Sequence, residues 1–407
     1  MTKRTRKHAD DLRAASKLVV TSVTRVNDAV EDVHRTIASG PRWLGKPLAI
    51  PARLLTFVAY RPTRLVMQVV GAGIDALLSQ FAPYLGESVP GAQREAVVAA
   101  LNGVVGDYLR DTENPLAIEM QFRRDGAPLA LTAEELDARF PDAETKLLIL
   151  VHGSSMNDLG WTRHGHDHGA ALSREFGYAP IYLYYNSGLH ISTNGREFAT
   201  LLEQLVEAWP VPVDEVSILC HSMGGLVTRS ACHIAEVQAL SWRRKLRRFV
   251  CLGSPHHGSA MERGGSWLHA ILGATEYSAP IGKLARLRGA GITDMRFGYV
   301  LDEHWEGRDR FALHADARAN LTLPDGVQCY AIAGSTSSAM SGRVAGDGVV
   351  AIESALGKHA RRDLTLPYPP SHQWVALGTS HLDLLSRPEV YAQLRSWFAS
   401  AEDRGNE

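Results

Sequence analysis

The sequence predicts an α/β protein with a mostly parallel central sheet, and three observations support this prediction. After residue 115, short apolar segments alternate with segments of helical periodicity, as is typical of parallel strands buried on both faces. The interval 258–326 is long, carries Gly and Ser clusters and breaks this alternation, as an inserted cap would. The preceding residues show helical patterns. We therefore expect an N-terminal helical region over 1–114 and a sheet domain over 115–400 that carries the cap.

The N-terminal region combines helical stripes with positive charge. Apolar residues recur every three or four positions over 19–37, 65–81 and 97–108, which predicts three helices. Residues 1–64 hold 13 Lys or Arg and 5 acidic residues, a net charge of +8, so the rest of the chain carries −9. Two interpretations stay open. The helices pack on the sheet domain, or they hold the protein on an anionic membrane surface.

The composition is that of an ordinary globular protein with a formal net charge of −1, which favours no nucleic acid partner. Four cysteines lie in apolar segments without a C-x-x-C pair: Cys220, Cys232, Cys251 and Cys329. They are expected to be buried free thiols in a reducing compartment. We find no secretory signal and no uninterrupted apolar span of about 20 residues. We therefore expect a cytoplasmic protein.

Apolar segments after residue 145 predict the strands of the sheet. They lie at 146–151, 180–185, 215–220, 247–252, 327–333 and 374–378. Helices are expected near 167–176, 195–209, 223–237 and 387–399. A hairpin is expected before these elements, because an alternating segment at 116–122, the turn signal Asp125-Gly126 and a second apolar segment at 127–132 follow one another.

A serine between a strand and a glycine pair suggests a nucleophile at Ser222. The strand 215–220 ends just before it, and a helix is expected to begin near Met223. Such a turn would expose a strained hydroxyl at the carboxyl edge of the sheet, where the helix N-terminus faces developing negative charge. Cys220 stands where this turn usually has glycine, so we expect a slightly more open turn, while Gly224 lets the helix pass close to the strand. The alternative is a serine in an ordinary loop.

Two backbone N–H groups are expected to face the anion that forms when Ser222 attacks a carbonyl. One belongs to Met223, directly after the nucleophile, and the other to Ser154, in the loop after an earlier strand. Gly153 would let the chain turn so that the N–H of Ser154 points into the site. Each such donor contributes about 2.7–4 kcal/mol to transition-state stabilisation. His152 is expected to have a structural role.

The base and its orienting acid should follow the serine in the order acid, then histidine. His381 follows the last predicted strand and precedes the last helix, which places it at the same edge as Ser222. Asp347, between two glycines after an earlier strand, is the expected acid, and Asp383 is its competitor. In this arrangement His381 accepts the proton of Ser222, while Asp347 holds the imidazole and stabilises its charged form.

Five motifs in this order resemble the α/β-hydrolase superfamily, and within it the bacterial triacylglycerol lipases and the GPI inositol-deacylase-like esterases. The resemblance covers about residues 145–400 and rests on Val151-His152-Gly153, Cys220–Gly225 and the segments 252–259, 346–350 and 380–385. It implies an eight-stranded sheet, a mobile lid and ester substrates with an acyl chain. In some such lipases a calcium ion braces the loop that carries the acid, but this sequence does not reveal ligands for one. Cys220 and the helical N-terminal region depart from the family pattern.

The segment WTRHGHDHGAAL concentrates possible metal ligands. His164, His166, Asp167 and His168 alternate in a spacing that matches no recognised zinc pattern. Asp167 is expected to cap the helix that follows it. We therefore expect no metal ion and no cofactor.

These residues favour a serine hydrolase that cleaves carboxylic esters, with acyl lipids as substrates. An acyltransferase or thioesterase could use the same three residues with another acceptor, and a membrane-associated scaffold with a hydrolase-like domain is a third hypothesis. The basic N-terminal region predicts peripheral contact with the inner face of the membrane. In that case deletion of residues 1–110 should leave hydrolysis of short soluble esters intact. If the helices pack on the sheet domain, the same deletion should give insoluble or inactive protein.

Overall fold

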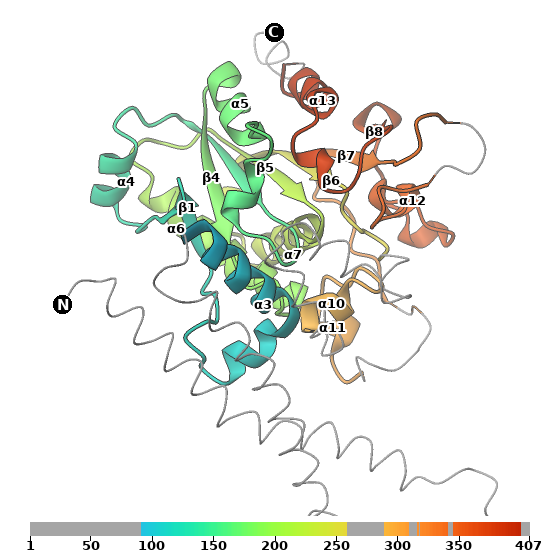
Figure 1. The fold of residues 1–407 in the computed structure, drawn as a ribbon. Helices are drawn as coiled ribbons and strands as arrows, with labels where there is room; N and C mark the ends of the chain where they lie inside the picture. The colour runs from blue at the N-terminus through green and yellow to red at the C-terminus, as the bar shows by residue number, and fades with distance from the viewer. Residues whose placement is uncertain (1–90, 259–288, 309–315, 317, 341–344, 400–407) are drawn as a thin grey trace, which may run out of the picture. The chain divides into compact units, whose positions relative to one another are not determined.

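The computed structural model describes residues 91–258, 289–308, 316, 318–340 and 345–399 (Figure 1). The chain divides into two compact units, one of Met1–Arg94 with Leu109–Ala117 and one of Glu95–Tyr108 with Ile118–Glu407. The second unit contains the whole sheet. The helices predicted over 19–37 and 65–81 lie outside the described residues, as does much of the predicted cap. The domain boundary near residue 114 and the extent of the cap stay predictions.

An eight-stranded sheet forms the centre of the second unit, in the order β2-β1-β4-β3-β5-β6-β7-β8. Strands β3 to β8 run parallel, and β1 pairs antiparallel with β2 and β4. The strands are β1 Gln121–Arg124, β2 Ala127–Pro128, β3 Lys146–Val151, β4 Tyr178–Tyr184, β5 Glu215–His221, β6 Leu246–Leu252, β7 Gln328–Gly334 and β8 Gln373–Ala376. This mostly parallel sheet between helices confirms the predicted α/β-hydrolase fold.

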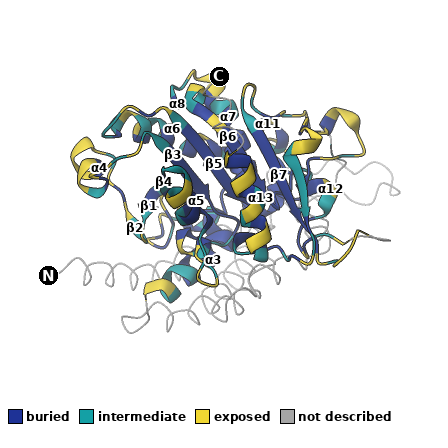
Figure 2. Ribbon diagram, turned by 90° about the horizontal axis from the view of Figure 1, so that it is seen from above, coloured by how far each residue is buried: buried dark blue, intermediate teal, exposed yellow. Residues whose placement is uncertain are grey.

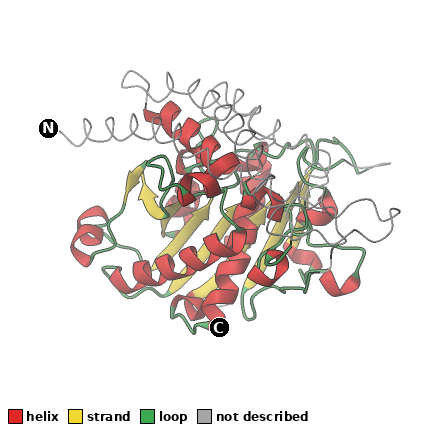
Figure 3. Cartoon of the chain, turned by 90° about the horizontal axis from the view of Figure 1, so that it is seen from below, coloured by secondary structure: helices red, strands yellow, loops and turns green. Residues whose placement is uncertain are grey.

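Helices cover both faces of the sheet (Figures 1 and 3). The α-helices are α3 Gly91–Asp111, α4 Ala133–Arg139, α5 His168–Phe176, α6 Ile191–Ala208, α7 Met223–Val237, α8 Trp242–Lys245, α10 Ala290–Asp294, α11 Asp302–Trp305, α12 Ile352–Ala355 and α13 Pro388–Ala399. Short 3-10 turns are η2 Asp158–Trp161, η5 Arg362–Leu364, η6 Pro370–His372 and η7 Asp383–Leu385. Within the described ranges, no helix combines the length and apolar character needed to cross a bilayer.

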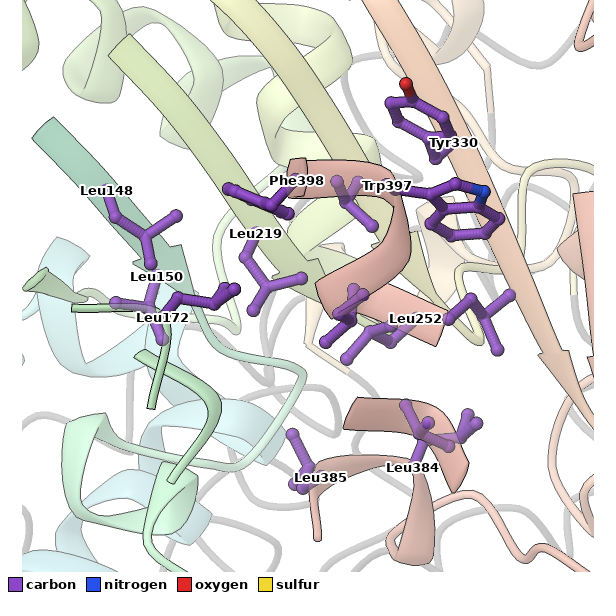
Figure 4. Packing of buried hydrophobic residues seen from close by; sticks show 14 of the residues in the cluster. Leu148, Leu150, Leu172, Leu219, Leu252, Tyr330, Leu384, Leu385, Trp397 and Phe398 are labelled. Atoms are coloured by element: carbon purple, nitrogen blue, oxygen red, sulfur yellow. The ribbon is translucent and has the colours of Figure 1, made fainter. Parts of the chain in front are cut away.

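The two faces of the sheet have different partners because successive strand residues point in opposite directions. On one face, apolar residues of the central strands pack against α5 and α13 (Figure 4). Tyr330 of β7 stacks on Trp397 of α13 there, with 4.6 Å between ring centroids. On the other face, Cys220 of β5 contacts Thr228 of α7. Replacing one buried leucine of this core with alanine should cost about 2–5 kcal/mol.

Burial follows the same layering (Figure 2). The central strands are buried along nearly their whole length, whereas the outer faces of α4, α5 and α13 are exposed. A sheet buried in this way can carry reactive groups only at its edges, where the strands end and the loops begin.

The strand predictions are confirmed within two residues at every bound of β3 to β8. The hairpin is shorter than expected, since β1 begins only at Gln121. Its turn is as predicted, with Asp125 at φ 53° and Gly126 at φ 72°. Helix α4 was not predicted, although Thr132 caps it by accepting a hydrogen bond from the N–H of Glu135.

Candidate active site

Ser222 stands on a sharp turn between β5 and α7. Its backbone has φ 54° and ψ −125°, a conformation that costs a non-glycine residue on the order of 1–3 kcal/mol. The turn is held by two backbone hydrogen bonds, from Ser222 N–H to the carbonyl of Leu252 (2.9 Å) and from Gly225 N–H to the carbonyl of Ser222 (3.1 Å). The predicted strand–turn–helix around this serine is therefore present, with its strain concentrated at the serine itself.

The side chain of Cys220 packs against α7. Its Sγ lies 3.0 Å from Thr228 Oγ1, and its side chain is fully buried. Burial raises the pKa of this thiol well above its ordinary value, so it stays protonated. Gly224 lets α7 come close to the end of β3, because it has no side chain. A Cβ at this position would lie only 2.4 Å from the carbonyl oxygen of Val151. Gly224 thus allows the close contact between helix and strand. The position of Cys220, in contrast, tolerates a small apolar side chain.

His381 and Asp347 form a buried hydrogen-bonded pair at this edge of the sheet. His381 Nδ1–H donates to Asp347 Oδ2 over 2.7 Å, and His381 N–H donates to the Asp347 carbonyl over 2.9 Å. The other carboxylate oxygen, Oδ1, accepts from the N–H groups of Val349 (2.9 Å) and Val350 (2.7 Å). The loop after β7 therefore fixes the carboxylate, and the carboxylate fixes the ring of His381.

Asp383 does not contact the imidazole. Its Oδ2 instead accepts from the hydroxyl of Ser380 (2.6 Å) and from the N–H of Ser380 (3.3 Å). This carboxylate stabilises the start of η7, the 3-10 turn that follows His381. Of the two acids considered from the sequence, Asp347 is the one that the structure brings to His381.

The pair lies beside the turn that carries Ser222. Gly253 follows Leu252, the acceptor of the Ser222 N–H, and a Cβ on Gly253 would lie 3.1 Å from both Asp347 Oδ2 and His381 Nδ1. His381 Nε2 is buried and has no hydrogen-bond partner among the described residues. No hydrogen bond joins it to the hydroxyl of Ser222 within that part of the chain. The three residues share one sheet edge, and in the described part of the chain Nε2 of His381 makes no hydrogen bond.

The loop after β3 meets the turn from the opposite side. A Cβ on Gly153 would lie 2.9 Å from the Cβ of Ser222, so only glycine allows this contact. Ser154 and Met223 are buried, and across the described residues neither backbone N–H donates to a protein acceptor. Two unpaired N–H groups thus flank Ser222, as expected for donors that are kept for a bound group.

His221 is a site residue to which the sequence assigned no role. Its Nε2–H donates to the carbonyl of His381 over 3.0 Å, and the two ring centroids are 4.6 Å apart. Burial lowers the pKa of His221 well below its ordinary value, so the ring is neutral. The only available signal was its position directly before Ser222, which does not reveal a partner 160 residues away.

His152 has the structural role predicted for it. Its ring is fully buried and stacks on Tyr185 with 4.3 Å between centroids, and its Nδ1–H donates to the Gly153 carbonyl over 2.8 Å. Burial lowers the pKa of His152 to about 4. The ring therefore supports the loop of Gly153 as a neutral group.

His256 and His257 hold loops together. Tyr368 O–H donates to His256 Nε2 over 3.1 Å. His257 Nδ1 accepts from Arg318 Nη2 over 2.8 Å, and its Nε2–H donates to the Gly357 carbonyl over 2.9 Å. Arg318 belongs to the predicted insertion 258–326, so His257 ties the described part of that insertion to the sheet domain.

The histidine-rich segment after β3 forms a hydrogen-bonded chain. His166 Nε2–H donates to His168 Nδ1 over 2.8 Å, and His168 Nε2–H donates to the Leu384 carbonyl over 2.9 Å. Asp167 caps α5 as predicted, accepting from the N–H of Ala170 over 2.9 Å. No group of three or more potential metal ligands occurs in the described ranges.

Comparisons with known proteins give one partial family match and several similar solved structures. A family model described as a domain of unknown function (DUF7379) matches residues 121–286, less than half of the chain. No curated protein sequence matches significantly. Among solved structures, the chain is similar to the mature lipase BlEst2 of Bacillus licheniformis, with 13% identity, a TM-score of 0.42 and coverage of 69% of this chain and 98% of the lipase.

Two further solved structures have comparable similarity. An esterase from Thermogutta terrifontis is 15% identical with a TM-score of 0.38, over 70% of this chain and 94% of the esterase. The RedJ thioesterase from Streptomyces coelicolor is 13% identical with a TM-score of 0.34, over 68% of this chain and 96% of the thioesterase. Similarity at this level does not identify a substrate, and the fold follows from the strand order and from the turn at Ser222.

Proposed function

We propose that the protein is a serine hydrolase that cleaves carboxylic esters through Ser222, His381 and Asp347. One observation carries the proposal. A strained serine turn and a buried Asp–His pair, which come from three distant parts of the chain, meet at one edge of the sheet. A serine in an ordinary loop would have no reason to retain a strained backbone next to an imidazole whose outer nitrogen, among the described residues, has no hydrogen-bond partner.

In the proposed reaction, the hydroxyl of Ser222 turns toward His381 Nε2, which takes its proton as the oxygen attacks the ester carbonyl. The hydrogen bond between them would form with substrate bound, because such contacts are often absent in free enzymes. Asp347 stabilises the imidazolium, and the N–H groups of Ser154 and Met223 bind the oxyanion. His381 then protonates the leaving alcohol, and water hydrolyses the acyl-enzyme by the same route.

We propose acyl lipids as the substrate class, in line with the resemblance to lipases. An acyltransferase or thioesterase would use the same residues, since these activities differ in the group that accepts or releases the acyl chain. A hydrolase-like scaffold without activity would have no need for the buried Asp347–His381 pair with its four hydrogen bonds. The intact pair therefore favours an enzyme.

A chain-length series of p-nitrophenyl esters tests the activity and its substrate class. Wild type should hydrolyse these esters, and Ser222→Ala should lower turnover about 10⁴-fold or more. A preference for longer chains would support acyl lipids. Addition of an alcohol or a thiol acceptor would divert the acyl group in a transferase, whereas a hydrolase would release the free acid. Equal turnover by wild type and Ser222→Ala would refute the proposed nucleophile.

We also propose that the basic residues over 1–64, which lie outside the described residues, bring the protein to the cytoplasmic face of an anionic membrane. Residues 95–108 belong to the unit of the sheet, so a deletion of 1–110 would remove part of its core. The informative deletion is 1–90. Flotation with anionic vesicles should be lost in that variant and at high salt, and absence of the full chain from the vesicle fraction at low salt would contradict membrane contact.

A further inference from the structure

Helix α3 reaches the loops at the carboxyl edge of the sheet. Its residues Glu95–Tyr108 belong to the same compact unit as the sheet. Val97, Leu101 and Val104 on this helix are at most 1% exposed. The matched family model begins only at residue 121, after α3 has ended. Residues 95–108 of α3 are therefore part of the sheet domain, and the family match does not account for them.

Gly103 brings the backbone of α3 into contact with the loop after β3. A Cβ on Gly103 would lie 2.0 Å from Ser155 Oγ and 2.8 Å from Ser155 Cα, distances that no real side chain tolerates. Ser155 directly follows Ser154 and has φ 59°, in the left-handed region that few non-glycine residues adopt. Its N–H donates to Ser187 Oγ over 2.9 Å. The loop is thus held between α3 and the loop after β4.

A kink in α3 gives the helix further contacts with neighbouring loops. Val105 has φ −131° and ψ 23°, outside helical values. Two carbonyls at the kink accept hydrogen bonds from outside the helix. That of Val104 accepts from the N–H of Gly289 over 2.7 Å, and that of Gly106 accepts from Asn186 Nδ2 over 2.9 Å. Kinks release backbone carbonyls for such contacts, so α3 binds the loop that contains Ser187 as well as the loop of Ser155.

The donors of an oxyanion hole cannot be fixed by hydrogen bonds of their own, because those N–H groups must stay unpaired for the substrate. They have to be held by their neighbours in the chain. Next to Ser154 these neighbours are Ser155, which contacts Gly103, and Gly153, which contacts Ser222. A shift of Ser155 would pass through one peptide bond to the N–H of Ser154.

We propose that Gly103 is a positioning residue for the oxyanion hole: it lets α3 press directly on Ser155 and so keeps the N–H of Ser154 beside Ser222. The inference rests on the proposed ester hydrolysis and assigns α3 to the catalytic domain. An alanine at position 103 should push the loop away from the nucleophile. Substrate binding should be less affected than the chemical step, because the oxyanion forms only during that step.

The test compares two alanine substitutions on one helix, with p-nitrophenyl butyrate as substrate. Gly103→Ala should lower kcat by roughly 10²-fold with little change in KM, the loss expected when one oxyanion donor is displaced. Gly91→Ala is the matched control, since a Cβ there would meet nothing within 4 Å, and its kcat should stay at the wild-type value. Thermal unfolding midpoints of the three proteins separate a catalytic effect from loss of fold.

A rescue and an isosteric variant complete the test. Ser155→Gly removes the side chain that an alanine at position 103 would contact, and glycine suits the positive φ. The double variant Gly103→Ala/Ser155→Gly should therefore have a kcat about 10-fold higher than Gly103→Ala. This is part of the loss that a displaced donor causes. If Gly103→Ala does not fold, Asn186→Asp removes the Nδ2 donor to Gly106 at unchanged size and should still lower kcat. Wild-type kcat in the folded variant tested would overturn the inference. Inactive wild type would overturn the proposed function, and the inference with it.

Discussion

The two sides of Ser222 are built by different means. On one side, polar contacts fix the acid–base pair, because Asp347 accepts hydrogen bonds from His381, Val349 and Val350. On the other side, the N–H groups of Ser154 and Met223 have no partner among the described residues, and close backbone packing through glycines holds the loop. Groups that exchange protons can be oriented by permanent hydrogen bonds. Groups that must bind a transient charge are left unpaired and are positioned by packing.

The largest effect should come from breaking the polar side. Asp347→Asn is expected to lower kcat by about 10⁴-fold, because a neutral amide cannot stabilise the imidazolium and can select the wrong tautomer of His381. Asp383→Asn is the control and should keep turnover close to wild type, since the Asp383 carboxylate accepts hydrogen bonds from Ser380 and, in the described part of the chain, none from His381. Steady-state kinetics of both variants would decide, and a dead Asp383→Asn would show that the wrong acid has been assigned.

A smaller effect is expected from His221, which links the serine turn to the backbone of His381. His221→Leu removes the donor to the His381 carbonyl and should lower kcat by roughly 10-fold, in line with the cost of about 1–1.5 kcal/mol for one lost hydrogen bond. His221→Gln places an amide N–H near the position of Nε2 and should retain most of the activity. Equal kinetics for the two variants would mean that the bond to His381 does not matter for catalysis.

The last expected effect concerns the stability of the fold at low pH and not the turnover. Burial lowers the pKa of His152 and of His168 to about 4, from an ordinary value of 6.5. Between these pH values the unfolded chain binds protons that the folded chain does not, so stability is lost as the pH falls from 6.5 toward 4. Each ring should lower the free energy of unfolding by ~3 kcal/mol once the pH reaches the pKa that the ring has in the folded protein.

Urea unfolding at pH 7 and pH 5 measures this loss. The free energy of unfolding should fall between the two values, and His152→Gln should lose less than wild type because the variant has one titrating ring fewer. His164→Gln is the control, since His164 is exposed. A wild-type stability that does not change between pH 7 and pH 5 would contradict the picture of neutral, buried rings that support the loops around the site.

Much of the polar side could be predicted from the sequence. The alternation of apolar segments and helices predicted the strands of a parallel sheet. Asp347 and His381 each follow a predicted strand, so both were expected at the carboxyl edge of the sheet. Asp347 could be preferred over Asp383 because only Asp347 lies on a separate loop. When strands and helices alternate regularly, the strands run parallel, and residues that directly follow a strand can be assigned to the carboxyl edge of the sheet.

The side of Ser222 that close backbone packing holds in place could not be predicted in the same way. Gly103 lies within a helical stripe, and nothing in its neighbours along the chain indicates that it contacts Ser155. His221 bonds to a carbonyl far along the chain, which no local pattern encodes. Helix α4 is a different case, because Thr132 and Glu135 form a helix-start pattern that was present in the sequence and overlooked. Contacts between backbone atoms that are far apart along the chain are therefore the hardest to predict from sequence.

If the protein is a serine hydrolase, Ser222 is its nucleophile and His381 activates it. This assignment is tested most directly by treating the full-length protein with a fluorophosphonate probe and locating the adduct by mass spectrometry of its peptides. A single adduct on Ser222 is expected in wild type, with no adduct in Ser222→Ala and strongly slowed labelling in His381→Ala. Unchanged labelling of Ser222→Ala, or an adduct on another residue of wild type, would contradict this assignment.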